Sequence, residues 1–283
     1  MGAFLSTTDL AYGAAATICA VQLLTPANPI GSTLRLFKQF RKQEKALTSA
    51  GNVNKGIEEY NRLHASESAE ERNKEYKTLV NSYYDLATLF YEWGWGQSFH
   101  FAYRYPHESF KQSILRHEYY LASKLGLSSD ASKLKVLDVG CGIGGPLRNI
   151  CKFTKADVTG ITLNQYQVDR GNELSNADPQ LGTSKCRSVQ GDFMELPFED
   201  SSFDAAYAIE ATCHAPDRVA VYSEIFRSLK PGSIFACYEW CMTDNYDPKN
   251  ADHRRIKKQI EEGDGLPDIC GTNDCLDAMK KSG

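Results

Sequence analysis

Short apolar runs alternate with amphipathic stretches through the second half of the chain. Continuous apolar runs of a few residues predict strands, whereas apolar residues spaced three and four apart predict helices. The predicted strands are residues 134–139, 157–161, 187–190, 203–209 and 233–239. The predicted helices are residues 146–153, 165–174 and 218–229, and a turn is predicted at 230–232. Strands and helices alternate, except that the fourth strand follows the third directly. This order predicts an α/β fold with a doubly wound, mostly parallel sheet, and we place that core at residues 131–245.

The chain before this core has a different pattern. Residues 41–78 are polar and charged, which is typical of a linker with helical pieces. Residues 76–130 are dense in aromatic side chains and end in a stretch with helical spacing at 109–125, which Gly126 closes. We therefore expect a helical segment at 76–130 that adjoins the α/β core.

An apolar run at 10–24 stands out within the N-terminal segment, residues 1–75. The run is shorter than the roughly 18 apolar residues that a membrane span requires, and it lacks the basic residues that precede the apolar part of a secretory signal. Basic residues follow it instead, so that an anchor would leave the rest of the chain in the cytosol. The alternative is a surface or packing helix that Pro26 and Pro29 end.

Composition narrows the class of protein. The 283 residues suffice for one substantial domain with appended segments. A net charge of −4 argues against a nucleic-acid-binding protein, which would normally carry a basic patch. The nine cysteines form neither a Cys-x-x-Cys pair nor a cluster with zinc-ligand spacing, so we expect free thiols in a reducing compartment and no metal.

A glycine-rich loop follows the first predicted strand and opens the next helix. Glycines in such a place allow a tight turn and let backbone N–H groups approach a ligand closely. The run Asp-x-Gly-x-Gly-x-Gly differs from the dinucleotide fingerprint Gly-x-Gly-x-x-Gly and is the form typical of methyltransferases. We therefore expect S-adenosylmethionine as the cofactor. The residues of this loop that are expected to hold it are Asp138, Gly140, Cys141, Gly142, Gly144 and Gly145.

Further polar residues fall at the ends of the predicted strands, where an open α/β sheet binds its ligands. Asp192, with Phe193 beside it, follows the third strand and is placed to bind an adenine amine, although Asp192 as a turn former is the alternative. Glu210 ends the fourth strand, beside the expected methyl donor. The acid that usually binds a ribose is missing after the second strand, so Thr162 and Asn164 are expected to do so as neutral groups.

Four blocks of sequence resemble those of the sterol 24-C-methyltransferases: YEWGWGQSFHF at 91–101, LDVGCGIGGP at 137–146, IEATCHAPD at 209–217 and YEWCMTD at 238–244. The resemblance covers roughly two thirds of the chain, and the first block is its specific part. The glycine loop alone would not separate this family from tocopherol, phosphoethanolamine or cyclopropane-fatty-acid relatives. The resemblance implies a Rossmann-like class I methyltransferase with a helical N-terminal substrate-binding segment, which acts on a sterol at the cytosolic face of the endoplasmic reticulum membrane or in the cytoplasm.

The resemblance also implies a mechanism. Enzymes of this family methylate a side-chain alkene at C24, which leaves a carbocation that aromatic faces stabilise by roughly 0.5–2 kcal/mol each. A base must then remove a proton, and Glu210 and His214 are the leading candidates, with Glu92 and His100 next; one of these acidic groups can instead hold the sterol 3-hydroxyl. A helix cap is the alternative role for His214, and a packed helical core is the alternative for the aromatic residues. The residues expected to bind the substrate are Tyr83, Tyr91, Trp93, Trp95, Phe99, Tyr238 and Trp240.

The resemblance implies that this chain is truncated at its C-terminus. Members of the family continue beyond Gly283, so residues 246–283 are expected to begin a longer C-terminal region, and the last two strands of a seven-stranded sheet are expected to be missing. The strand at 233–239 would then be an uncovered apolar edge, which favours aggregation. We expect peripheral or anchored membrane association and a homo-oligomer.

Two other functions stay open. A methyltransferase acting on another prenyl lipid, such as a tocopherol precursor, shares the glycine loop. A catalytically impaired protein that binds sterol or cofactor is compatible with a truncated chain. The acceptor sterol is also open among cycloartenol, lanosterol, zymosterol and 24-methylene lophenol, as is the number of methylations.

Overall fold

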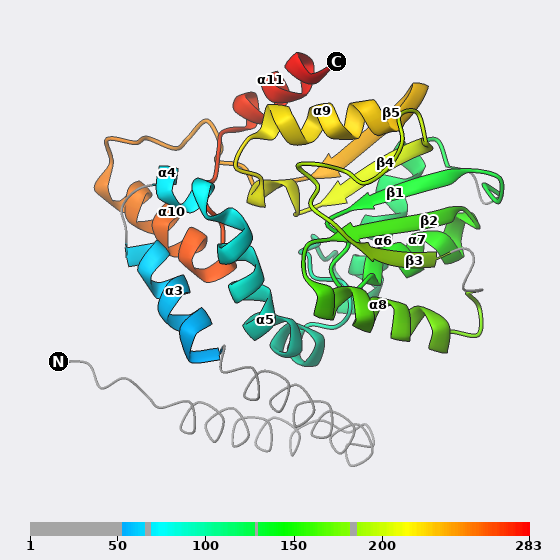
Figure 1. Cartoon of the computed structure of the whole chain (residues 1–283), viewed down its shortest axis with the longest axis horizontal. Helices are drawn as coiled ribbons and strands as arrows, with labels where there is room; N and C mark the ends of the chain where they lie inside the picture. The colour runs from blue at the N-terminus through cyan, green and yellow to red at the C-terminus, as the bar shows by residue number, and fades with distance from the viewer. Residues whose placement is uncertain (1–52, 66–68, 128–129, 182–185) are drawn as a thin grey trace, which may run out of the picture. The chain divides into compact units, whose positions relative to one another are not determined.

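The computed structural model describes residues 53–65, 69–127, 130–181 and 186–283, which belong to one compact unit, Val53–Gly283 (Figure 1). The apolar run at 10–24, and with it the membrane-anchor hypothesis, lies outside the described residues. Within the described ranges, no helix combines the length and the hydrophobicity that crossing a bilayer requires.

A parallel sheet of five strands forms the centre of this unit (Figure 1). Its order is β3-β2-β1-β4-β5, and every neighbouring pair is parallel. The strands are β1 (Lys135–Val139), β2 (Asp157–Thr162), β3 (Cys186–Gln190), β4 (Phe203–Ile209) and β5 (Leu229–Tyr238). The predicted α/β fold is confirmed. The winding reverses between β1 and β4, and in open sheets the ligand crevice lies at the carboxyl ends of the strands at such a reversal.

Helices connect and flank these strands. They are α3 (Val53–Ala65), α4 (Ala69–Lys74), α5 (Tyr76–Gly94), α6 (Phe110–Lys124), α7 (Gly145–Thr154), α8 (Gln165–Ala177), α9 (Arg218–Ser228), α10 (Ala251–Asp264) and α11 (Thr272–Ser282), with a 3-10 helix at Thr212–His214. The helices α7, α8 and α9 are the crossovers between parallel strands that the sequence predicts. The predicted polar linker at 41–78 contains α3 and α4 in its described part.

The turn predicted at 230–232 is instead part of β5. Phe203 pairs with Leu229, whereas Ala205 pairs with Ile234, so that an irregularity in the register absorbs the extra residues. In the described part of the chain β5 lies at an edge of the sheet, as expected for the strand at 233–239, and the side chain of Ile234 is 46% exposed.

Both faces of the sheet are buried. Val136, Ala205 and Tyr207 pack in one apolar cluster with side chains of α6 and α7. Leu137 and Ala206 point the other way and pack with α9 and α11. Burial on both faces explains why the central strands β1 and β4 read as continuous apolar runs rather than as alternating ones.

A layer of helices, α3, α4, α5 and α10, stands beside the carboxyl ends of the strands (Figure 1). Tyr83 of α5 donates a hydrogen bond of 3.1 Å to the carbonyl oxygen of Gly263 in α10. Arg72 of α4 donates from Nε to the carbonyl oxygen of Pro267 at 2.8 Å. These contacts join segments from the two ends of the described chain, and they place the end of α10 next to the predicted aromatic segment.

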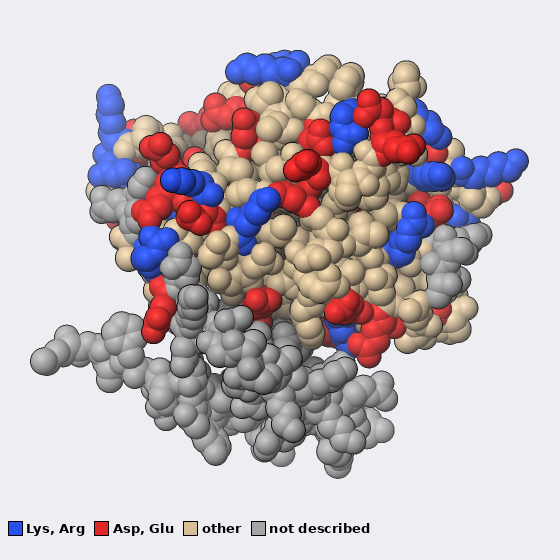
Figure 2. Space-filling model, in the orientation of Figure 1, with Lys and Arg blue, Asp and Glu red and all other residues tan. Residues whose placement is uncertain are grey.

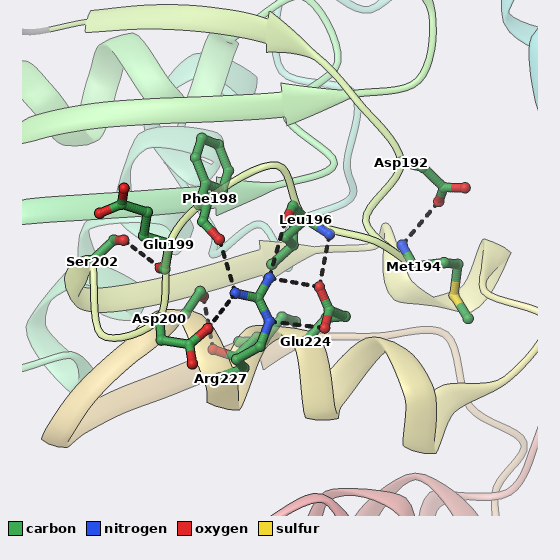
Figure 3. A network of polar contacts seen from close by, with 11 residues as sticks. Asp192, Met194, Leu196, Phe198, Glu199, Asp200, Ser202, Glu224 and Arg227 are labelled. Carbon is green, nitrogen blue, oxygen red and sulfur yellow. Dashed lines mark hydrogen bonds and ion pairs between the residues drawn. The ribbon is translucent and has the colours of Figure 1, made fainter.

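Acidic and basic side chains are mixed over the face that Figure 2 shows. One network of charged groups, centred on Arg227 of α9, positions part of the site (Figure 3). Its guanidinium donates to both carboxylate oxygens of Glu224, at 2.9 and 2.8 Å, and to the carbonyl oxygens of Leu196 at 3.0 Å and Phe198 at 2.8 Å. These bonds hold the loop after β3 against α9. The loop carries Asp192 at its start.

Candidate functional site

The glycine loop makes a turn that requires glycine. Gly140, Gly142 and Gly144 have φ angles of 80°, 53° and 73°, which L-residues with side chains rarely adopt. A β-carbon on Gly140 would lie 2.3 Å from the β-carbon of Ala211 in the segment after β4. The helix α7 then begins at Gly145 without a side-chain cap, and Pro146, which has no N–H, stands in its first turn.

A first cavity, of about 680 Å³ when the open space at its mouth is included, lies in front of this loop, at the carboxyl ends of β1 and β4. Gly140, Cys141 and Gly142 line it, as do Thr162 and Asn164 after β2. Phe193, Glu210 and His214 complete a wall of mixed polar and apolar character. Such a cleft, with backbone groups exposed by glycine and a few polar side chains, fits a nucleoside-containing cofactor.

Four predicted cofactor residues do not line this cavity: Asp138, Gly144, Gly145 and Asp192. The side chain of Asp138, within β1, is buried and accepts a hydrogen bond of 2.8 Å from the hydroxyl of Tyr207. Burial raises the pKa of Asp138 to about 7. The carboxylate of Asp192 accepts from the hydroxyl of Tyr76 and lies 2.7 Å from Nζ of Lys77, at the start of α5. Asp192 therefore joins the loop after β3 to the helical layer.

The two neutral residues after β2 also have protein partners. Thr162 donates from its hydroxyl to Oε1 of Gln167 at 2.7 Å. Asn164 caps α8 through its oxygen and donates from Nδ2 to the carboxylate of Asp85 at 2.6 Å. Both residues still line the cavity, and Asp85 of α5 is an acid near this position that the sequence does not predict.

A second cavity, of about 460 Å³ when the open space at its mouth is included, adjoins the first and has mainly aromatic walls. Five residues line both cavities: Tyr84, Phe99, His100, Glu210 and His214. Of the predicted substrate-binding residues, those that line the second cavity are Tyr83, Tyr91, Trp95, Phe99 and Trp240. The predicted aromatic block and the end of β4 therefore do meet at one place.

Two predicted aromatic residues lie elsewhere in the structure. Trp93 is not among the residues that line either cavity. The ring of Tyr238 stacks on His117 with centroids 3.7 Å apart, and its hydroxyl donates to the carbonyl oxygen of His117 at 3.2 Å. Tyr84 and Asp264 line the second cavity without having been predicted. Burial raises the pKa of Asp264.

Glu210 stands in the wall between the two cavities. Its Oε1 accepts a hydrogen bond of 2.9 Å from the backbone N–H of Phe101, and its Oε2 accepts one of 3.1 Å from the indole N–H of Trp240. Burial raises the pKa of this carboxyl to about 7. The residue has a φ angle of 51°, a conformation that costs a residue other than glycine about 1–3 kcal/mol and that is typical of functional sites.

His214 lies in the same wall and is uncharged at neutral pH. Its Nε2 is 3.1 Å from the hydroxyl of Tyr84, and complete burial lowers its pKa to about 4. A neutral imidazole without a carboxylate beside it is a poor trap for a proton at pH 7. The geometry therefore favours Glu210 over His214 as a proton acceptor.

His100 forms a buried pair with Glu118 of α6, which the sequence does not single out. Its Nε2 lies 3.1 Å from Oε1 of Glu118, and its Nδ1 donates to the carbonyl oxygen of Phe101 at 2.9 Å. Ser98 and Asn149 donate to the two carboxylate oxygens of Glu118 at 2.7 and 2.8 Å. Burial alone would lower the pKa of His100, but the hydrogen bond and charge of Glu118 outweigh it and raise that pKa.

Glu92, the remaining predicted base, points away from both cavities. Its carboxylate forms a two-pronged ion pair with the guanidinium of Arg170 in α8, with 3.0 Å between Nε and Oε2. Neither cavity includes it among its lining residues. The structure thus gives Glu92 a contact that joins α5 to α8.

The glycine loop and the aromatic block contact each other directly. A β-carbon on Gly145 would lie 2.1 Å from the carbonyl oxygen of Gln97, so only glycine allows this approach. Arg148 of α7 donates to the carbonyl oxygen of Ile143 at 2.7 Å and to Oε1 of Gln97 at 2.8 Å. These contacts join the loop that lines the first cavity to the segment that lines the second.

The sequence is similar to several characterised methyltransferases. A family model described as a methyltransferase domain matches residues 137–237. A cycloartenol-C-24-methyltransferase of Arabidopsis thaliana is 55% identical over 80% of this chain and 67% of its own length. A cycloartenol-C-24-methyltransferase of Oryza sativa subsp. japonica is 55% identical over 82% of this chain and 66% of its own length. A sterol 24-C-methyltransferase of Schizosaccharomyces pombe is 50% identical over 80% of this chain and 60% of its own length. The chain spans about two thirds or less of the length of these relatives.

Solved structures with the same fold are more distant. A putative sarcosine dimethylglycine methyltransferase from Galdieria sulphuraria superposes with a TM-score of 0.59 at 25% identity, over 69% of this chain and 72% of that one. A geranyl diphosphate C-methyltransferase from Streptomyces coelicolor superposes with a TM-score of 0.60 at 21% identity, over 72% and 78%. Both likenesses support the α/β fold described above.

The contact at Gly145 can be tested by substitution. Gly145→Ala is expected to lower the free energy of unfolding by about 1–3 kcal/mol and to weaken cofactor binding, because the new methyl group forces the two loops apart. Gly263→Ala is the matched control, since a β-carbon there has open space, and it should change stability by less than about 1 kcal/mol. Denaturant unfolding and calorimetric titration with S-adenosylhomocysteine measure both effects. Equal stability and affinity in Gly145→Ala and the unsubstituted chain would refute the contact.

The charge state of His100 gives a second test. In the folded protein its imidazole should titrate above the reference value of about 6.5, and in Glu118→Gln below it, because burial remains while the carboxylate is lost. The stability that the raised pKa contributes is complete below about pH 6.5 and is lost as the pH rises through the folded-state pKa. Imidazole NMR shifts against pH report this directly. The control Glu108→Gln removes a surface partner of Arg116 and should leave the His100 titration unchanged. If the His100 pKa in Glu118→Gln equals that in the unsubstituted chain, the pairing is contradicted.

Proposed function

The chain belongs to the sterol 24-C-methyltransferase family, and we propose that it transfers a methyl group from S-adenosylmethionine to C24 of a sterol side chain. The observation that carries the proposal is the shared wall between the two cavities. A cofactor cleft framed by glycines and an aromatic cavity have Phe99, His100 and Glu210 in common. A methyl group on one side and an alkene on the other would meet at these residues.

The first cavity supplies the groups that would hold S-adenosylmethionine. Gly140, Cys141 and Gly142 would offer backbone atoms from the loop between β1 and α7, and Thr162 and Asn164 would bind the ribose. Phe193 offers an apolar face for the adenine. When bound, this cofactor supplies an electrophilic methyl group on a sulfonium centre.

The second cavity supplies what a carbocation requires. Tyr83, Tyr91, Trp95 and Trp240 present aromatic faces, whose negative quadrupole stabilises a cation by roughly 0.5–2 kcal/mol each when it is desolvated. These rings exclude water and carry no strong nucleophile that would trap the cation. After the alkene has taken up the methyl group, the neighbouring carbon must lose a proton, and its bonding electrons then form the new double bond.

Glu210 is the residue that would take this proton. It touches both cavities, and its carboxylate is held in place by two N–H donors, from Phe101 and Trp240. A pKa near 7 leaves the carboxylate ionised in a substantial fraction of molecules at neutral pH and strengthens it as a base. His100, held by Glu118, orients the same wall through its hydrogen bond to Phe101.

Asp264 adds a polar side to the aromatic cavity. It lines this cavity and does not line the cofactor cleft. Next to it, the hydroxyls of Tyr83 and Tyr91 are 2.7 Å apart, and Tyr83 donates onward to Gly263. Tyr91 must then donate to Tyr83, which leaves the oxygen of Tyr91 free to accept a hydrogen bond. The 3-hydroxyl lies at the opposite end of a sterol from C24, so it would bind away from Glu210 and these tyrosines.

A sterol is a bilayer lipid, so we also place the chain at the cytosolic face of the endoplasmic reticulum membrane. Sterols dissolve in the hydrocarbon region of the bilayer and not in water, so the enzyme must draw its substrate from a membrane. Flotation of the full chain with sterol-containing vesicles tests this location. A homo-oligomer stays a prediction.

The acceptor decides between sterol methylation and its alternatives. We expect transfer of a labelled methyl group from S-adenosylmethionine to at least one of cycloartenol, lanosterol, zymosterol and 24-methylene lophenol, with the label at C24. Transfer to a tocopherol precursor alone would favour the prenyl-lipid alternative. Cofactor binding in calorimetry without transfer to any acceptor would favour a binding protein that lacks catalysis.

The proposed catalytic role of Glu210 can be tested separately from any effect of the residue on folding. Glu210→Gln is expected to lower kcat by at least about 100-fold while S-adenosylhomocysteine still binds, because the amide cannot accept the proton. The unsubstituted enzyme should gain activity as the pH rises through about 7, where Glu210 ionises. Glu92→Gln is the matched control, since it alters an acid outside both cavities, and it should keep kcat within a few fold. Comparable kcat values for the two variants would rule out Glu210 as the base.

A further inference from the structure

Three thiols meet on the face of the sheet that α11 covers. Cys241 follows β5, Cys270 precedes α11, and Cys275 lies in its first turn; all three belong to one apolar cluster. None forms a disulfide in the described structure. Cys241 interacts with both Cys270 and Cys275, and these interactions raise the pKa of Cys241.

The backbone around the trio holds Cys241 and Cys270 side by side. Met242 and Gly271 form a parallel bridge, with hydrogen bonds of 2.8 Å from Met242 N–H to the carbonyl oxygen of Cys270 and 3.3 Å from Thr272 N–H to that of Met242. Cys241 and Cys270 each stand one residue before this bridge. Neighbouring strands lie about 4.8 Å apart, which falls within the roughly 4.4–6.8 Å between α-carbons that a disulfide spans.

The surroundings of the trio stabilise a thiolate. The Cys241 thiol and the hydroxyl of Tyr222, 3.1 Å from the sulfur, lower the pKa of Cys275 to about 6, against the opposing effects of burial and Glu239. The hydrogen bond with Cys241 also lowers the pKa of Cys270, and the charge of Arg218 adds to it. Cys270 is partly exposed, whereas Cys275 is only 5% exposed.

We propose that Cys241 and Cys270 are a site of reversible oxidation, at which a hydroperoxide converts the two thiols into a disulfide. The Cys270 thiolate attacks one peroxide oxygen, the O–O bond breaks, and a sulfenic acid and hydroxide form. The sulfur of Cys241 then attacks the sulfenic sulfur, the S–O bond breaks, and the departing oxygen takes the Cys241 proton and leaves as water. Two thiols lose two electrons, and hydrogen peroxide is reduced to two molecules of water.

The disulfide would reach the candidate active site through one residue. Trp240 directly precedes Cys241, and its indole N–H donates to Oε2 of Glu210. A covalent bond at Cys241 would therefore restrict the segment that positions the proposed base. The oxidation itself does not rest on the proposed function, because it depends only on the thiols and their neighbours.

A second thiol pair in the same chain serves as an internal control. Cys151 and Cys186 also lie side by side, and both are 2% exposed. Both of these thiols are buried, whereas Cys241 and Cys270 are half-buried, so a peroxide has less access to Cys151 and Cys186. Proximity is thus shared by both pairs, whereas access from solvent is found mainly at Cys241 and Cys270.

The test titrates the reduced full chain with hydrogen peroxide, alkylates the remaining thiols after denaturation, and maps peptides by mass spectrometry. We expect a Cys241–Cys270 cross-link at peroxide concentrations that leave Cys151 and Cys186 alkylated. The cross-link closes a loop of about 30 residues, so Tm should rise by several degrees and return after reduction with dithiothreitol. Cys270→Ser should abolish both effects, and the matched control Cys186→Ser should abolish neither.

Three results would overturn the proposal. They are the absence of the Cys241–Cys270 peptide after full oxidation, its formation no more readily than a Cys151–Cys186 peptide, and an unchanged Tm response in Cys270→Ser. If Cys270→Ser does not fold, Cys241→Ser provides the same comparison, because either substitution removes one sulfur of the disulfide. Labelling of sulfenic acid with dimedone in Cys241→Ser should then mark Cys270, and labelling elsewhere would contradict the assigned order of steps.

Discussion

The close approach of the aromatic block to the glycine loop is the contact on which the rest of the site depends. Gly145 leaves room for the carbonyl oxygen of Gln97, and Arg148 bonds to both loops. With Gln97 fixed, the residues that follow it are fixed as well, and the N–H of Phe101 reaches Glu210. A loop that binds a cofactor and a loop that lines an aromatic cavity thus become two sides of one wall.

The charged groups in this wall are buried or, in the case of Glu210, half-buried, and each is held by specific partners. Burying an ionised group costs several kcal/mol unless hydrogen bonds or an opposite charge compensate it. Glu118 receives Ser98 and Asn149 as well as His100, and Glu210 receives two N–H donors. These partners hold the charged groups in place. Fixed groups suit a reaction through a carbocation, because a mobile base would capture it.

The sheet and the cofactor loop could be predicted because their signals are local. Apolar runs buried on both faces and glycines at positive φ angles leave a direct trace in the sequence. The turn predicted at 230–232 was wrong, since this Lys-Pro-Gly stretch lies within β5, where an irregularity in the pairing with β4 accommodates it. Glu118 could not be found in the same way, because on α6 it looks like any polar helical residue.

Residue roles in the site depended on tertiary contacts that spacing does not encode. Glu92 stands in the most specific block of the sequence, yet its carboxylate turns to Arg170 on another helix. Asp192 ends a strand as a cofactor ligand would, but Tyr76 and Lys77 engage it. Asp264 comes from α10, far along the chain, and enters the cavity only because α10 packs on α3 and α5.

The central claim is that one wall, with Glu210 in it, separates cofactor from sterol. A crystal structure of the chain with S-adenosylhomocysteine and a bound sterol tests it most directly. The account predicts the cofactor sulfur before the glycine loop, C24 of the sterol in the aromatic cavity, and the carboxylate of Glu210 in contact with the sterol side chain. A sterol bound outside the aromatic cavity, or a Glu210 carboxylate turned away from both ligands, would contradict it.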